Sequence, residues 1–148
     1  MTVDIRARGR LVAVLLAIAA SMLAWGCGAS RRAPPTGQLI PVREADFKIT
    51  APHASTAGEV DFRVSNEGPD RHEFIVARSE SGRLPLRSDG VTVDEETIEK
   101  SEAGALEPDQ PGGTRDLRVH LAPGRYVLFC NMTGHYMGGM HSTLVVSQ

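Results

Sequence analysis

Short runs in which apolar and polar residues alternate, each closed by turn residues, place the strongest constraint on the fold of this chain. Val60, Phe62 and Val64 alternate with charged residues, which is the period of a strand with one buried face. Further short β-rich runs occur near 45–50, 74–76, 117–121, 126–130 and 143–146. With 15 Gly, 9 Pro and 5% aromatic residues, the chain has many turns and few large core side chains. The pattern predicts an all-β fold built of short strands.

One stretch between the predicted strands favours a helix. About 35 residues separate the strand ending near Arg78 from the one starting near Thr114, which is long for a bare loop in a compact domain. The segment 92–103 is rich in acids, and Thr92 and Glu95 have the spacing of a capping box. We therefore expect a two-sheet, Greek-key β-sandwich of about seven or eight strands with a short helical excursion.

The N-terminus has the pattern of an export signal. Arg6, Arg8 and Arg10 precede a mainly apolar run over 11–25. This run has 15 residues, whereas a helix that spans a bilayer needs roughly 20. We therefore interpret residues 1–26 as a signal peptide, and we expect the rest of the chain to be exported, to the periplasm or the outer face of the cell membrane.

Cys27 follows the apolar run directly. The sequence Leu-Ala-Trp-Gly-Cys over 23–27 resembles the lipobox of bacterial lipoproteins, and this resemblance implies that lipid is attached to Cys27. An uncleaved anchor and ordinary signal-peptidase cleavage nearby are the alternatives. We interpret residues 27–41, which contain two adjacent prolines, as the anchor cysteine with a flexible tether, and residues 42–148 as the folded domain.

Charge and length exclude several classes of protein. The chain has 148 residues, with 16 Lys+Arg against 18 Asp+Glu and a formal net charge of -2. This balance is unsuited to nucleic-acid binding, and the length suits one domain. The sequence also contains no recognisable nucleophile and base pair, paired-carboxylate cleft, phosphate loop or zinc motif, so we do not expect an enzyme.

The last 20 residues of the chain carry the strongest chemical signal. Cys130, His135 and Met140 form a Cys-x4-His-x4-Met pattern on one loop between two predicted strands. A thiolate, an imidazole and a thioether are soft donors that favour copper over magnesium, calcium or manganese. Glycines in the loop allow it to turn back sharply so that the three side chains converge. A trigonal site also needs a second imidazole, and the candidate is His72 at the start of the 74–76 strand.

These two segments together resemble the cupredoxins, the small blue copper proteins related to plastocyanin and azurin. The resemblance rests on the pattern Val-x-Asn-x-Gly-x-x-x-His over 64–72 and on the Cys-x4-His-x4-Met loop, and it covers roughly residues 45–148. It implies a cupredoxin-like sandwich that binds one type 1 copper ion. By this likeness the equatorial ligands are His72 through Nδ1, Cys130 as thiolate and His135, and the axial ligand is Met140.

One residue departs from the family pattern. Plastocyanin and azurin usually have an asparagine after the first histidine ligand, and its side chain helps to hold the cysteine loop; here the residue is Glu73. Its carboxylate either accepts a hydrogen bond from the loop or lies nearer the metal and lowers the reduction potential.

Other interpretations of the same residues compete with the copper site. Cys130 can be a small buried hydrophobe and His72 a structural histidine, but an exported free thiol is exposed to oxidation unless a metal holds it. Met132 and Met137 are either the apolar rim of the site or extra ligands for Cu(I).

The resemblance implies a one-electron carrier that works outside the cytoplasm. Its partners would be redox proteins bound transiently, and we expect a monomer held at the membrane by its lipid, with no nucleic-acid partner. The alternative is a copper carrier or accessory protein that loads a membrane oxidase. A redox enzyme would need a second copper site and further histidines, which one cupredoxin unit does not supply.

Overall fold

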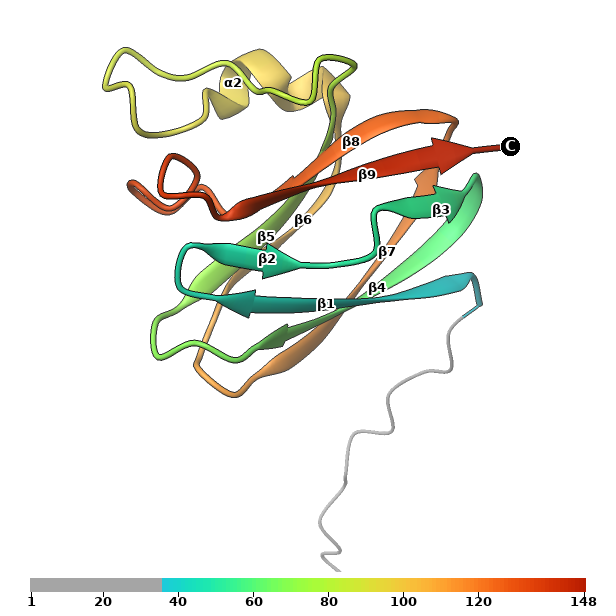
Figure 1. Ribbon diagram of the computed structural model, residues 1–148, viewed down its shortest axis with the longest axis horizontal. Helices are drawn as coiled ribbons and strands as arrows, with labels where there is room; N and C mark the ends of the chain where they lie inside the picture. The colour runs from blue at the N-terminus through green and yellow to red at the C-terminus, as the bar shows by residue number, and fades with distance from the viewer. Residues whose placement is uncertain (1–35) are drawn as a thin grey trace, which may run out of the picture. The chain divides into compact units, whose positions relative to one another are not determined.

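The computed structural model describes residues 36–148, which fold into a β-sandwich of two sheets (Figure 1). The first sheet has the order β2 (Lys48–Thr50), β1 (Gln38–Ala45), β4 (Gly58–Asn66), β7 (Thr114–Leu121). The second has the order β3 (Ala54–Thr56), β9 (His141–Ser147), β8 (Gly124–Phe129), β5 (His72–Arg78), β6 (Glu102–Asp109). The prediction of an all-β sandwich is confirmed, with nine strands in the described part instead of seven or eight.

The first strand lies further towards the N-terminus than the sequence suggested. β1 begins at Gln38, within the stretch interpreted as a tether, and it pairs in parallel with β4. Buried and exposed side chains alternate along β1, with Ile40 and Val42 buried, but the proline between them does not indicate a strand in the sequence. The strand tolerates this proline because β2 pairs with β1 only from Arg43 onwards, so β1 has an open edge beside Pro41. The folded unit therefore starts before residue 42, while the predicted signal peptide and Cys27 lie outside the described residues.

The helical excursion is shorter than predicted. The α-helix α2 spans only Glu95–Ile98 and continues as a 3-10 turn over Glu99–Ser101. Its N-cap is Asp94, whose side chain accepts from the Thr97 N–H, so the capping box from Thr92 is wrong. The chain then enters β6, an edge strand whose acidic residues gave no strand signal. None of the helices within residues 36–148 is long and apolar enough to cross a membrane.

Two apolar clusters stabilise the domain, one on each face of the second sheet. The cluster between the sheets includes Phe62 and Phe74, whose ring centroids are 5.4 Å apart, and also contains Cys130 and Met140. The second cluster joins Ile75, Val127 and Phe129 of that sheet to apolar residues of the 79–101 excursion. In Figure 1 the excursion with α2 covers the end of this sheet from which the loop between β8 and β9 projects. Tyr136 in that loop belongs to the second cluster.

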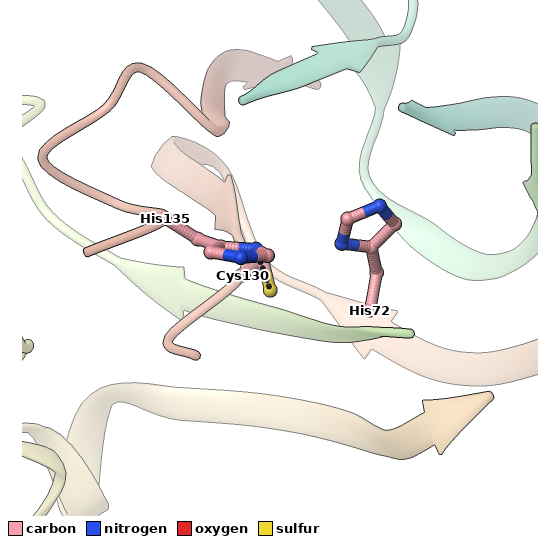
Figure 2. Close-up of side chains that lie close together, drawn as sticks. All are labelled: His72, Cys130 and His135. Carbon is pink, nitrogen blue, oxygen red and sulfur yellow. Dashed lines mark hydrogen bonds between the residues drawn. The ribbon is translucent and has the colours of Figure 1, made fainter. Parts of the chain in front are cut away.

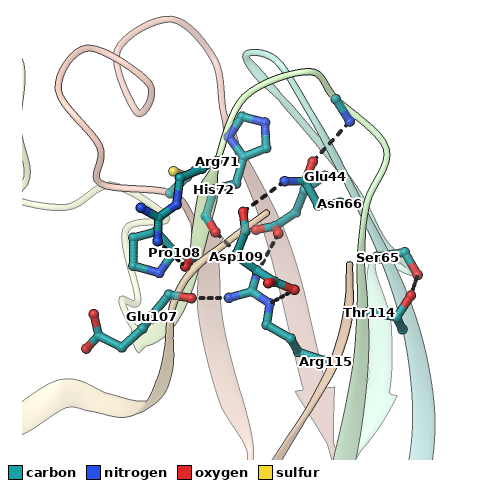
Figure 3. Close-up of polar contacts among 12 residues, drawn as sticks. Glu44, Ser65, Asn66, Arg71, His72, Glu107, Pro108, Asp109, Thr114 and Arg115 are labelled. Atoms are coloured by element: carbon teal, nitrogen blue, oxygen red, sulfur yellow. Dashed lines mark hydrogen bonds and ion pairs between the residues drawn. The ribbon is translucent and has the colours of Figure 1, made fainter. Parts of the chain in front are cut away.

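A buried ion pair links the first sheet to the start of β5 (Figure 3). Glu44 on β1 has no exposed surface, and Nη2 of Arg115 donates to its Oε2 at 3.0 Å. The same Nη2 donates to the main-chain oxygen of His72 at 3.2 Å, and Asp109 lies 3.3 Å from the Arg115 Nε. Burial raises the pKa of Glu44 to about 7, because the loss of hydration outweighs the attraction of Arg115.

We predict that Glu44 makes the protein less stable as the pH rises. Between the usual carboxyl pKa and about 7 the folded protein keeps a proton that the unfolded chain releases, so its free energy of unfolding falls as pH rises through this window. The full effect is about 3 kcal/mol at most. Denaturant unfolding of the metal-free Glu44→Gln variant from pH 4 to 8 should show a correspondingly flatter pH dependence. Glu96→Gln, at an exposed carboxyl, is the control; a wild-type slope in Glu44→Gln would contradict the assignment.

Candidate metal centre

Three side chains from two distant segments meet at one end of the sandwich (Figure 2). His72 is the first residue of β5, Cys130 directly follows β8, and His135 lies on the loop that leads to β9. One ligand atom from each of the three lies within 4.8 Å of the other two. The structure therefore brings together the three residues that the sequence predicted as nitrogen and thiolate donors.

His72 has the environment of a ligand and not that of a satisfied core histidine. It is fully buried, and its Nδ1 has no hydrogen-bond partner within the described residues. Nε2 lies 3.3 Å from the Asp46 carboxylate, and the other nitrogen faces Cys130 and His135 in Figure 2. Burial lowers the pKa of His72, and the neighbouring His135 lowers it further. A neutral imidazole with an unpaired buried nitrogen is costly unless a metal accepts its lone pair, so this residue fits a metal site.

Cys130 completes the set of buried donors. It is a free cysteine with no exposed surface, and its Sγ lies 3.6 Å from Nδ1 of His135. The main-chain N–H groups of Glu73 and Met132 donate hydrogen bonds to its sulfur. Burial nevertheless raises the pKa of the thiol to about 11. The metal-free thiol therefore keeps its proton near neutral pH, and metal binding at this site would release it.

Met140 lies at the closure of the ligand loop. The Cys130 N–H donates to the Met140 carbonyl at 3.1 Å, and the Met140 N–H donates to the His135 carbonyl at 2.9 Å. Its side chain is fully buried in the apolar cluster that also contains Cys130. These bonds fix the backbone of the fourth predicted ligand next to the other two residues of the loop.

Glu73 performs one of the two roles considered for it. The main-chain N–H of Asn131 donates a hydrogen bond to its carboxyl, so this side chain accepts a hydrogen bond from the ligand loop. Burial raises the pKa of Glu73, with smaller contributions from the nearby acids Glu95 and Glu107.

Sequence reasoning missed three neighbours of the site. Asn131 accepts from the Val93 N–H at 2.6 Å, donates to the Val93 carbonyl at 3.0 Å and donates to Glu95 at 2.6 Å, so it fastens the excursion to the ligand loop. Asp46 contacts His72, and the ring of Phe47 lies 5.3 Å from that of His135. Asn131 is adjacent to Cys130 in the sequence, but nothing in the sequence pointed to the turn at 46–47.

The remaining histidines of the described residues lie apart from the three donors. His53 contacts the Thr143 carbonyl at 3.1 Å, and His120 pairs with Glu59 at 2.9 Å. The ring of His141 lies 5.0 Å from that of Tyr136. None of them joins the group of His72, Cys130 and His135.

Comparison with solved structures identifies the architecture. No protein-family model matches the chain, and no curated protein matches it. Among solved structures, reduced auracyanin from Roseiflexus castenholzii is 20% identical with a TM-score of 0.57, and the match covers 76% of this chain and 98% of that one. Auracyanin A from Chloroflexus aurantiacus, described as a "blue" copper protein, is 16% identical with a TM-score of 0.57. This match covers 74% of this chain and 98% of that one. Rusticyanin from Thiobacillus ferrooxidans is 16% identical with a TM-score of 0.55, and the match covers 76% of this chain and 79% of that one.

The chain has the cupredoxin fold. Within this cupredoxin sandwich, His72, Cys130 and His135 lie where the sequence resemblance implied that they would meet, at the end of the sheets that carries the β8–β9 loop. The donor set of two imidazoles and a thiol, with a thioether at the loop closure, is a soft set that suits copper.

We predict that Asn131→Ala loosens the ligand loop from the excursion. The change leaves the buried N–H and carbonyl of Val93 without their partner, which should lower the free energy of unfolding by roughly 2–4 kcal/mol. Hydrogen exchange should show the loss of protection at Val93 first. Thr133→Ala, at an exposed position of the same loop, is the matched control and should change little. Equal stability of the two variants would show that Asn131 does not anchor the excursion.

Proposed function

We propose that this protein binds one copper ion through His72, Cys130, His135 and Met140 and carries single electrons outside the cytoplasm. The observation that carries the proposal is the meeting of three donor atoms within 4.8 Å of one another, with His72 buried and its Nδ1 without a hydrogen-bond partner in the described residues. The likeness to copper proteins of the same fold supports it.

The donors suit an ion that changes its charge by one. Thiolate and thioether sulfur favour Cu(I), whereas imidazole nitrogen also binds Cu(II) well, and the mixed set serves both states. Copper supplies the one-electron redox change when it is bound. The protein contributes rigidity, because the Cys130–Met140 and Met140–His135 main-chain hydrogen bonds fix the loop on the sandwich. Little rearrangement is then needed when an electron arrives.

The same ligand set argues against catalysis on the metal. Four protein ligands leave no coordination position open for a substrate. His135 is half-buried, whereas His72 is fully buried, so we propose that electrons enter and leave past His135. The exposed ring of Phe47, which lies 5.3 Å from the ring of His135, flanks this route. A redox partner would contact a small area here, less than about 1,200 Å² in total, as transient electron-transfer complexes do.

Export and anchoring complete the proposal. The basic and apolar N-terminal pattern over 1–26 and the lipobox-like segment ending at Cys27 support an exported protein, held by lipid at the periplasmic or outer face of the membrane. We propose that it works there as a monomer.

We predict that Cys130→Ser abolishes the colour of the copper-loaded protein. Cu(II) bound by the thiolate should give an intense visible charge-transfer band, and a serine hydroxyl cannot supply the thiolate. Absorption and electron paramagnetic resonance spectra of the Cu(II) form measure this effect. Cys27→Ser, at the other cysteine, is the control and should keep the band. Colour retained in Cys130→Ser would refute the proposed site. A wild-type protein that binds Cu(I) tightly but forms no stable coloured Cu(II) complex would instead favour the alternative function of a copper carrier.

We predict that Met140→Leu keeps the band and raises the reduction potential. Removal of the weak thioether donor destabilises Cu(II) more than Cu(I). A rise of about 60 mV corresponds to a tenfold change in the preference between the two states. Protein-film voltammetry measures the potential, and Met137→Leu, at an exposed methionine of the same loop, should leave it nearly unchanged. Equal potentials in the Met140→Leu variant and the wild type would show that Met140 is not a ligand.

A further inference from the structure

The two-residue turn between β1 and β2 contacts both histidines of the site. Ala45 and Lys48 form the last pair of the hairpin, which leaves Asp46 and Phe47 as the turn. Oδ1 of Asp46 lies 3.3 Å from Nε2 of His72, while the Phe47 ring packs against His135. This turn belongs to the first sheet, and it contacts both imidazoles of the site.

The contact between Asp46 and His72 is enclosed. Both atoms are buried, and neither forms a hydrogen bond with any other group among the described residues. Gly68 closes the space beside them, because a Cβ at this position would lie 2.8 Å from the Asp46 Oδ1 and 3.0 Å from the His72 Nε2. The loop that carries Gly68 is itself fixed, since the Gly68 N–H donates to the Asn66 side chain at 3.0 Å. The carboxylate and the imidazole are thus held next to each other by the surrounding chain.

Phe47 shows that the position of the turn is imposed by packing. Its φ is 57°, a left-handed conformation that is strained for a bulky residue. Its ring lies directly over the ligand loop at Gly138, where a Cβ would come within 2.2 Å of the Phe47 Cδ1. The strain persists because this packing fixes the turn, and the same packing holds Asp46 against His72.

We propose that Asp46 is the positioning residue of the site: it accepts a hydrogen bond from Nε2–H of His72 and so directs the Nδ1 lone pair towards Cys130 and His135. A ligating histidine commonly gives its second N–H to such a partner, which fixes the tautomer and the ring orientation and makes the ligand more basic. Here the partner is a carboxylate, and its negative charge favours the more highly charged state of the bound ion. This last consequence rests on the copper function proposed above.

The hydrogen bond can be tested without copper. In the metal-free full-length protein at pH 8, proton NMR should show a strongly downfield Nε2–H resonance of His72, because a carboxylate acceptor deshields this proton. The resonance should move upfield in Asp46→Asn and further in Asp46→Ala. Asp70→Asn is the matched control, because Asp70 is exposed and acts on His72 only through its charge; it should leave the resonance in place. Thermal unfolding checks that each variant is folded.

The effect of the charge is tested with copper bound. Asp46→Asn should weaken the binding of Cu(II) relative to Cu(I) by about tenfold, which raises the reduction potential of a one-electron couple by about 59 mV. Asp70→Asn should change this ratio less than twofold. The proposal is overturned if the His72 resonance is absent in the wild type or unmoved in Asp46→Ala, or if the two asparagine variants shift the potential equally. A wild-type protein without a coloured Cu(II) form would instead contradict the copper function and leave the first test intact.

Discussion

Burial of the metal-binding donor atoms is the constraint on which the rest of this structure depends. His72 and Cys130 are both fully enclosed, one as an imidazole whose Nδ1 has no hydrogen-bond partner in the described residues and the other as a thiol whose ionisation is suppressed. Such groups are unfavourable in an apolar interior unless a partner compensates for their lost hydration. The surrounding strands, turns and loops can be understood as the framework that keeps these atoms at short range and out of water.

Several independent contacts supply this framework. Arg115 connects the carboxylate of Glu44 to the main-chain oxygen of His72, so the start of β5 is attached to the first sheet. Glu73 and Met132 direct main-chain N–H groups at the Cys130 sulfur, and Glu73 also receives the N–H of Asn131. The ligand loop is thus held by β5 on one side and by its own closing hydrogen bonds on the other.

The sequence was most informative where its pattern reflects a local rule. The alternation at Val60, Phe62 and Val64 identified β4, and the Cys-x4-His-x4-Met spacing identified the ligand loop, because both patterns depend on residues close in the chain. β1 was missed because a proline interrupts its alternation, and β6 because an exposed edge strand has little apolar pattern. Asp46 and Phe47 could not be found in this way, since their importance comes only from the packing of a remote turn against the site.

The position of the ligand loop relative to the two apolar clusters has a consequence for how the domain responds to change. Cys130 and Met140, at the ends of the loop, belong to the cluster between the sheets, whereas Tyr136 in its middle belongs to the cluster under the excursion and accepts the Leu84 N–H at 3.2 Å. The loop therefore bridges two separately packed interiors. A change of packing in either interior would therefore shift the same few ligand atoms. The absorption spectrum of bound copper would then respond to changes of packing in both apolar clusters.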